Sequence, residues 1–117
     1  MNLNSILIMN LSEIKAIIEQ VWEDRSLLQD DEVKEIISGV VDLLDKGKIR
    51  VAEKNQGVWV VNEWIKKAVI LYFPIQKMEL IEVGPFEFHD KIKLKKEYDK
   101  LGVRVVPHAI ARYGSYL

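Results

Sequence analysis

Apolar residues repeat with the spacing of an amphipathic α-helix over residues 11–23. The members of this stripe are Leu11, Ile14, Ile17, Ile18, Val21 and Trp22. Asn10 stands at the position of a helix N-cap, and Glu13 occupies the reciprocal position of a capping box. The pattern therefore predicts a helix that starts after Asn10 and buries one face.

A second helical pattern begins near Asp30 or Asp31, where a carboxylate stabilises a helix N-terminus. Its apolar face is formed by Val33, Ile36, Ile37, Val40 and Leu44. Gly47 can adopt the left-handed conformation that ends many helices. Because a short polar link joins the two predicted helices, we expect them to pack against each other.

The pattern changes at Ile49 to one that favours β-strands. The segments IRVAEK and VWVV are separated by Asn55, Gln56 and Gly57, which tolerate the positive φ angles of a tight turn. This spacing predicts a β-hairpin over residues 49–61. An isolated hairpin is only marginally stable in water, so we expect it to lie on the helices or to extend another sheet.

A third helix is predicted between Asn62, a residue suited to an N-cap, and Pro74, which cannot continue a helix. The side chains expected to face the core are Trp64, Ile65, Ala68, Val69 and Tyr72. The three helices and the hairpin together indicate the α+β class, as a small, mostly helical domain with one antiparallel β-hairpin.

The signals weaken over residues 75–101. Gly84 and Pro85 mark a turn, and the segment PFEFHDKIKLK alternates like an edge strand. Residues 95–101 can form a short helix that ends at Gly102.

Composition narrows the classes of protein to consider. The 117 residues include 17 basic and 18 acidic side chains, which argues against a general nucleic-acid binder. No apolar run approaches the about 20 residues of a membrane helix, and the first nine residues lack the pattern of a signal peptide. Cysteine is absent, which excludes disulfides and thiolate zinc sites and agrees with a cytoplasmic location. We interpret residues 1–9 as an N-terminal extension.

Few residues form a recognisable catalytic pattern. His89 and His108 are far apart and belong to no metal-binding motif, so no metal site is expected. Ser115 lacks the motif of a nucleophile elbow. Lys66 and Lys67 can hold an anion, but the solvated face of the third helix explains them better.

Two separated motifs resemble one enzyme family. The segment LLDKGKIRVAEKNQGVWVVNEWIKKAVILYF, residues 43–73, is similar to the N-terminal domain of bacterial 2,3,4,5-tetrahydropyridine-2,6-dicarboxylate N-succinyltransferases. The segment GVRVVPHAIARYG, residues 102–114, resembles the family's connection between that domain and the catalytic one. Residues 88–101 match poorly, and His108 stands where the family pattern has a second proline.

The resemblance implies a two-domain subunit of a homotrimer in lysine and diaminopimelate biosynthesis. Such an enzyme transfers succinyl from succinyl-CoA, its co-substrate, to the amine of a dicarboxylate substrate. The family's catalytic acids and coenzyme groove belong to a left-handed β-helix of hexapeptide repeats. We therefore expect an N-terminal α+β domain over residues 10–103 and a junction over residues 104–117. The junction includes a first hexad, IARYGS from Ile110, followed by nothing to stack on, so this tail is expected to be extended or frayed.

Arg104 is the one site residue that the resemblance implies for this chain, as a contact for the dicarboxylate substrate. A guanidinium suits that role because it binds a carboxylate through two parallel hydrogen bonds. Arg112 is a further candidate for an anion contact, although a solvated side chain at a coil corner is the preferred interpretation. We expect no catalytic residue, cofactor site or metal site in these 117 residues.

Three hypotheses for the chain remain open at this stage. The first is the N-terminal domain of the acyltransferase, inactive by itself. The second is a stand-alone module for protein interaction or self-association, without catalysis. The third is a decayed remnant of the enzyme, which the genomic sequence after codon 117 would test.

Overall fold

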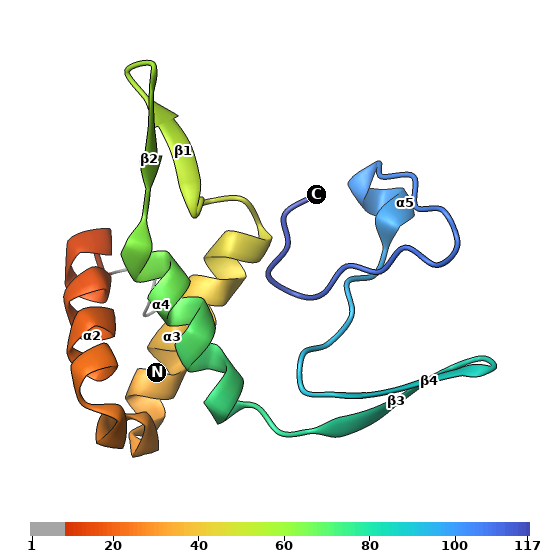
Figure 1. The fold of residues 1–117 in the computed structure, drawn as a ribbon, viewed down its shortest axis with the longest axis horizontal. Coiled ribbons are helices and arrows are strands. Elements are labelled where there is room, and N and C mark those ends of the chain that lie inside the picture. Colours follow the sequence, from red (N-terminus) through yellow and green to blue (C-terminus); the bar gives the residue numbers. More distant parts are fainter. Residues whose placement is uncertain (1–8) are drawn as a thin grey trace.

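Three α-helices form the core of the computed structural model, which describes residues 9–117 (Figure 1). They are α2 (Leu11–Glu23), α3 (Asp31–Asp45) and α4 (Glu63–Tyr72). Each contributes its predicted apolar stripe to one cluster, and the fully buried members are Ile14, Ile18, Val21, Ile37, Val40, Ile65, Ala68 and Leu71. Leu71 was not among the residues expected to face the core, whereas Val69 and Tyr72, which were, are only partly buried.

The predicted starts of α2 and α3 are confirmed, with one difference in detail. The Asn10 side chain accepts a hydrogen bond from the Glu13 backbone N–H at 2.9 Å, as an N-cap should. The Glu13 carboxylate, however, accepts from the Asn10 side-chain amide at 3.1 Å rather than from its backbone. Asp30 caps α3 by accepting from the Glu32 N–H at 2.8 Å.

The link between α2 and α3 is more ordered than the expected polar connection. It forms a 3-10 helix, η1 (Arg25–Gln29), which Asp24 caps through the Ser26 N–H. Leu28 in this turn is buried in the core, so the link contributes apolar packing as well as length.

The predicted first hairpin is present, as β1 (Ala52–Asn55) and β2 (Val58–Val61). Gln56 and Gly57 have φ angles of 50° and 82°, so the turn contains two residues and Asn55 belongs to the strand. All eight strand residues are exposed, and Figure 1 shows the hairpin projecting beyond the helices. The expectation that it lies on the helices or extends another sheet is therefore wrong.

Asn62 precedes α4 but does not cap it with its side chain. Its amide instead donates to the Arg50 carbonyl at 2.7 Å and to the Glu53 carboxylate at 3.3 Å, which ties the base of the hairpin together. The helix gives way to a short 3-10 turn, η2 (Phe73–Ile75), at the predicted proline.

The prediction of a single hairpin is wrong, because β3 (Glu79–Val83) and β4 (Phe86–Asp90) form a second one. Its register places Glu79 opposite Asp90 and Glu82 opposite Glu87. Like charges at opposed positions oppose pairing, and the apolar alternation is interrupted by these acids. Two sequence signals point to this hairpin, which are the turn at Gly84 and Pro85 and the alternation of the strand that follows.

The last part of the chain runs from β4 through α5 (Tyr98–Leu101) to the tail. Gly102 ends α5 with a φ of 69°, so the predicted short helix is confirmed in a shorter form. Residues 9–117 contain no β-helix coil, and residues from Ile110 form a single bridge, Leu94 to Arg112, instead of a hexad. The tail is also not frayed, since residues 113–116 pack against α3 and the residues that follow it.

The predicted extension, residues 1–9, lies outside the described residues except for Met9, which packs against the core. Among the helices in residues 9–117, none is long and apolar enough to cross a membrane.

We predict that Ile37→Ala destabilises the protein by about 2–5 kcal/mol, because Ile37 is fully buried between the helices and truncation leaves a cavity. Ile70→Ala is the matched control, because this isoleucine on α4 is 49% exposed and its truncation should change stability by about 0.5 kcal/mol or less. Urea unfolding of both variants measures the difference, and equal losses would contradict the assigned core.

Candidate functional site

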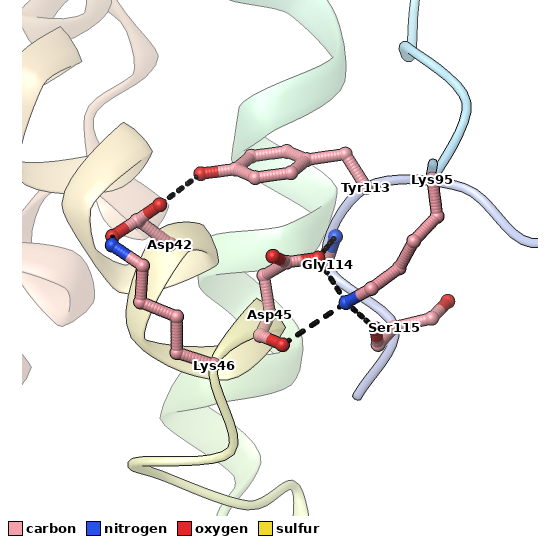
Figure 2. A network of polar contacts seen from close by, with 7 residues as sticks. All are labelled: Asp42, Asp45, Lys46, Lys95, Tyr113, Gly114 and Ser115. Carbon is pink, nitrogen blue, oxygen red and sulfur yellow. Dashed lines mark hydrogen bonds and ion pairs between the residues drawn. The ribbon is translucent and has the colours of Figure 1, made fainter. Parts of the chain in front are cut away.

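The tail returns to the C-terminal end of α3, where two aspartates bind it (Figure 2). The Tyr113 hydroxyl donates to Asp42 Oδ1 at 2.6 Å, and Lys46 Nζ donates to Asp42 Oδ2 at 2.6 Å. One turn further, Asp45 Oδ1 accepts from the Gly114 N–H at 2.9 Å and from Lys95 Nζ at 2.8 Å. Residues distant in the sequence therefore meet on one helix end.

Lys95 is the most enclosed charge in this network. Its side chain is 8% exposed and that of Asp45 is 17% exposed. The ammonium also donates to the backbone carbonyls of Asp45, at 3.1 Å, and Ser115. Removal of one partner of such a buried pair leaves an uncompensated charge, which typically costs about 3–5 kcal/mol.

Asp42 and Tyr113 shift each other's proton affinity. Partial burial alone would raise the pKa of Asp42, but the hydrogen bonds from Lys46 and Tyr113 outweigh it and hold that pKa below its usual value. Burial raises the pKa of Tyr113 above its ordinary value, and the hydrogen bond to the Asp42 carboxylate raises it further. The tyrosine is therefore a neutral donor to a charged acceptor over the physiological range of pH.

A short antiparallel contact holds the chain on either side of this network. The Lys95 N–H donates to the Ala111 carbonyl, and the Tyr113 N–H donates to the Lys93 carbonyl, both at 2.9 Å. Arg112 lies beside this ladder and pairs with Asp90 at 3.0 Å. Arg112 is exposed, as the preferred interpretation of a solvated side chain expects, and its guanidinium also pairs with an acid of β4.

Backbone donation also affects Asp90. The Lys91 N–H, and after it the hydrogen bond from Arg112, lower the pKa of this carboxyl. Asp90 therefore stays ionised, which keeps it available to pair with Arg112 at neutral pH.

Arg104 lies away from this network, in the irregular segment after Gly102. Its side chain is exposed, and across residues 9–117 it makes no hydrogen bond or ion pair. The structure thus presents an exposed guanidinium that is not already paired with an acid of the described chain. Its role as a contact for a dicarboxylate stays a prediction.

The other candidates from the sequence lie apart. His89 is exposed on β4, and His108 is exposed with a φ of 78°. Residues 9–117 hold no group of three or more His, Cys, Asp or Glu side chains arranged to bind a metal. Ser115 takes part through its backbone, since its carbonyl accepts from Lys95 and its N–H donates to the Arg112 carbonyl at 3.1 Å.

The paired lysines of α4 have different environments. Lys66 is exposed beside Glu63, as a solvated face predicts. Lys67 is only 27% exposed in its side chain and pairs with Glu19 of α2 at 2.6 Å. For Lys67 the expected solvated position is wrong, because it links two helices.

Two apolar surfaces are exposed. Strand β2 presents Val58 and Trp59, each 66% exposed, next to Val60 and Val61. The second surface is a hollow of about 520 Å³ between the β3–β4 hairpin and the tail. The larger apolar side chains of its lining are Val83, Phe86, Phe88, Leu94, Tyr98, Pro107 and Ile110.

Sequence reasoning missed Asp42, Asp45, Lys95 and Tyr113 as a connected group. The contacts of Tyr113 with Asp42 and of Gly114 with Asp45 span 71 and 69 residues. No local pattern in the sequence therefore predicts them. The residues Tyr113, Gly114 and Ser115 were assigned to a repeat hexad.

Comparison with known proteins agrees with the two sequence motifs. Residues 13–75 match the family model described as the N-terminal part of tetrahydrodipicolinate N-succinyltransferase. The chain is 41% identical over 117 residues to 2,3,4,5-tetrahydropyridine-2,6-dicarboxylate N-succinyltransferase of Pseudoalteromonas translucida, covering 92% of this chain and 42% of the relative. A relative of the same name from Cupriavidus metallidurans is 42% identical over 115 residues, with 89% and 42% covered. The chain thus spans about two fifths of the length of these relatives.

We predict that Tyr113→Phe lowers the free energy of unfolding by about 1–2 kcal/mol at neutral pH, because a hydrogen bond to a carboxylate is lost. The folded pKa of Tyr113 is raised, so its contribution is fully present below the unfolded value of about 10 and is lost as pH rises above it. The stability of the wild-type chain should therefore fall more steeply between pH 9 and 11 than that of the variant.

Urea unfolding at several pH values measures this difference. Tyr98→Phe is the control, since its hydroxyl has no hydrogen-bond partner within residues 9–117. An unchanged alkaline slope in Tyr113→Phe would contradict the assignment.

Proposed function

We propose, from the premise that this chain belongs to the tetrahydrodipicolinate N-succinyltransferase family, that it acts as the N-terminal domain of such an acyltransferase. In this role it helps to bind the dicarboxylate substrate and to assemble the enzyme, a homotrimer when full length. The reaction passes a succinyl group from succinyl-CoA to the substrate amine and belongs to lysine and diaminopimelate biosynthesis. The observation that carries the proposal is the match over residues 13–75, in a chain that also bears the Arg104 motif.

Arg104 is the residue that we assign to substrate binding. Its guanidinium is exposed and unpaired within residues 9–117, so a carboxylate need not displace a protein partner. Two parallel hydrogen bonds to one carboxylate would fix the orientation of the substrate as well as its position. The acyl transfer itself forms the amide C–N bond, breaks the thioester C–S bond, passes the amine proton to a base and releases CoA as its thiol.

We place that base and the groove for succinyl-CoA outside these 117 residues. Support comes from the share of the relatives that the chain covers, 42% of the Pseudoalteromonas translucida protein. The chain alone is then a binding and assembly domain without turnover.

We predict that the 117-residue chain binds pimelate, an open-chain dicarboxylate probe, weakly and at Arg104. One exposed ion pair contributes only about 0–1 kcal/mol, so a Kd of about 0.2 M or weaker is expected. NMR titration should shift the Arg104 side-chain Nε–H signal and the backbone amide signals of Val103 and Val105 on either side of it, and these amides report the response in the variants. Arg104→Ala should abolish the pimelate response, and Arg104→Lys should weaken it because lysine lacks the planar pair of donors.

Arg25→Ala is the matched control. This arginine is also exposed but lies over the Trp22 ring, at 4.5 Å from its centroid. A pimelate response that survives Arg104→Ala would contradict the assigned residue. Succinyl-CoA-dependent acylation by the purified chain would contradict the claim that it is inactive alone.

The second candidate function is self-association, and the exposed strand β2 favours it. Four consecutive apolar residues, Val58 to Val61, carry no charge that would oppose the pairing of two strand edges. This function predicts that light scattering after gel filtration gives a mass that rises with concentration. It also predicts that Val60→Lys returns the mass to that of one chain. A single-chain mass at all concentrations would contradict it.

A further inference from the structure

We infer that Asp45 is a positioning residue for Arg104. It closes the base of the segment formed by residues 96–113, called here the Arg104 lobe, and so fixes where the guanidinium lies relative to the helices. The inference rests on the proposed function of Arg104, although the closure can be tested without it.

The first step is that a single oxygen holds both ends of the lobe. Lys95 precedes the lobe and donates its ammonium to Asp45 Oδ1 at 2.8 Å. Gly114 follows the lobe and donates its backbone N–H to the same oxygen at 2.9 Å. Figure 2 shows these two donors approaching Asp45 from separate stretches of the chain. The carboxylate therefore joins the two ends to each other and to α3.

The second step is that the local ladder cannot replace this contact. The backbone bonds from Lys95 to Ala111 and from Tyr113 to Lys93 hold the two ends side by side. They connect the ends only to each other, however, and leave their position relative to the helices open. The described polar contacts that tie these ends to α3 are those of Asp45 together with the bond from Tyr113 to Asp42.

The buried charge of Lys95 also depends on Asp45. Lys95 is nearly buried, so its ammonium requires a carboxylate or several carbonyls. Asp45 provides both, through Oδ1 and through its own backbone carbonyl at 3.1 Å. An asparagine would keep an oxygen acceptor at this place but would lose the negative charge beside the Lys95 ammonium. Asp42 differs because it contacts only the far end of the lobe, through Tyr113.

The consequence reaches Arg104 through the backbone. Arg104 makes no hydrogen bond or ion pair across residues 9–117, so its own side chain does not fix its location. Its segment is anchored where the lobe begins and ends. A carboxylate on a helix thus governs the placement of a guanidinium that it does not contact.

Hydrogen exchange and pimelate titration of Asp45→Asn test this inference. The variant should raise exchange of the Gly114 amide, which donates to Asp45 Oδ1, by about tenfold or more, because this bond loses its charged acceptor. Exchange within α2 and α4 should stay as in the wild-type chain. The pimelate response at Arg104 should weaken although Arg104 itself is present.

Asp31→Asn is the matched control, since this aspartate lies on the same helix with its side chain 97% exposed. It should change neither exchange in the lobe nor the pimelate response. If Asp45→Asn disrupts the whole fold, Asp45→Asn combined with Lys95→Met removes both buried charges and leaves none uncompensated. That double variant should keep the exchange protection of α2 and α4 and lose the protection of the lobe.

The outcomes separate the two proposals. Wild-type exchange of the Gly114 amide in Asp45→Asn, or in the double variant, would overturn the closure. A faster-exchanging lobe with an undiminished pimelate response at Arg104 would overturn the positioning role. If the wild-type chain shows no response to pimelate while the lobe still loosens in Asp45→Asn, the proposed function of Arg104 fails and the closure is confirmed.

Discussion

The contact between Asp45 and Lys95 joins two parts of the molecule that are held together by different kinds of interaction. The helices α2, α3 and α4 are held by burial of aliphatic side chains, which is strong but has no preferred direction. The residues after β4 bury little, and Ile92 is the one core residue among them. Their arrangement therefore depends on directional contacts to the end of α3, of which the Asp45 carboxylate makes the most.

Such a contact contributes more to geometry than to stability. Two charges must leave water before they attract each other, and the net gain of a buried ion pair is often close to zero. Breaking it is costly, however, because the remaining charge has no partner. The pair thus penalises every arrangement of the tail except the one in which Lys95 meets Asp45. Tyr113 adds a second directional bond on the same side of the helix end.

The sequence allowed the three core helices and the first hairpin to be predicted because their signals are local. Periodic apolar residues, the caps Asn10 and Asp30 and the turn at Gly57 all act within a few residues. The second hairpin was missed because Leu80 and Ile81 stand next to each other between Glu79 and Glu82, which breaks the alternation of the first strand. The tail was misjudged because its partners lie about 70 residues away in sequence, at separations of 69 and 71. Arg104 was identified as a candidate from a sequence motif alone. The contacts of Asp45, to which we attribute its position, are not part of that motif.

The exposed apolar surfaces complete the picture of a domain whose core is small relative to its outline. Strand β2 and the hollow beside β4 lie outside the core cluster. Surfaces of this kind mark contacts with other protein more often than free surface. A domain of the proposed enzyme would use them for assembly, whereas a stand-alone module would use them for its partner.

The sequence separation of the Asp45 contacts also orders events during synthesis. All core residues of α2, α3 and α4 precede Lys95. The helical core is therefore complete in sequence before Lys95 and Gly114, the two partners of Asp45, emerge from the ribosome. The tail then docks on a preformed helix end, and closure of the long loop comes last because its entropy cost is repaid only by contacts at the end. The domain is thus built in the direction of translation, with the segment that carries Arg104 placed by the final step.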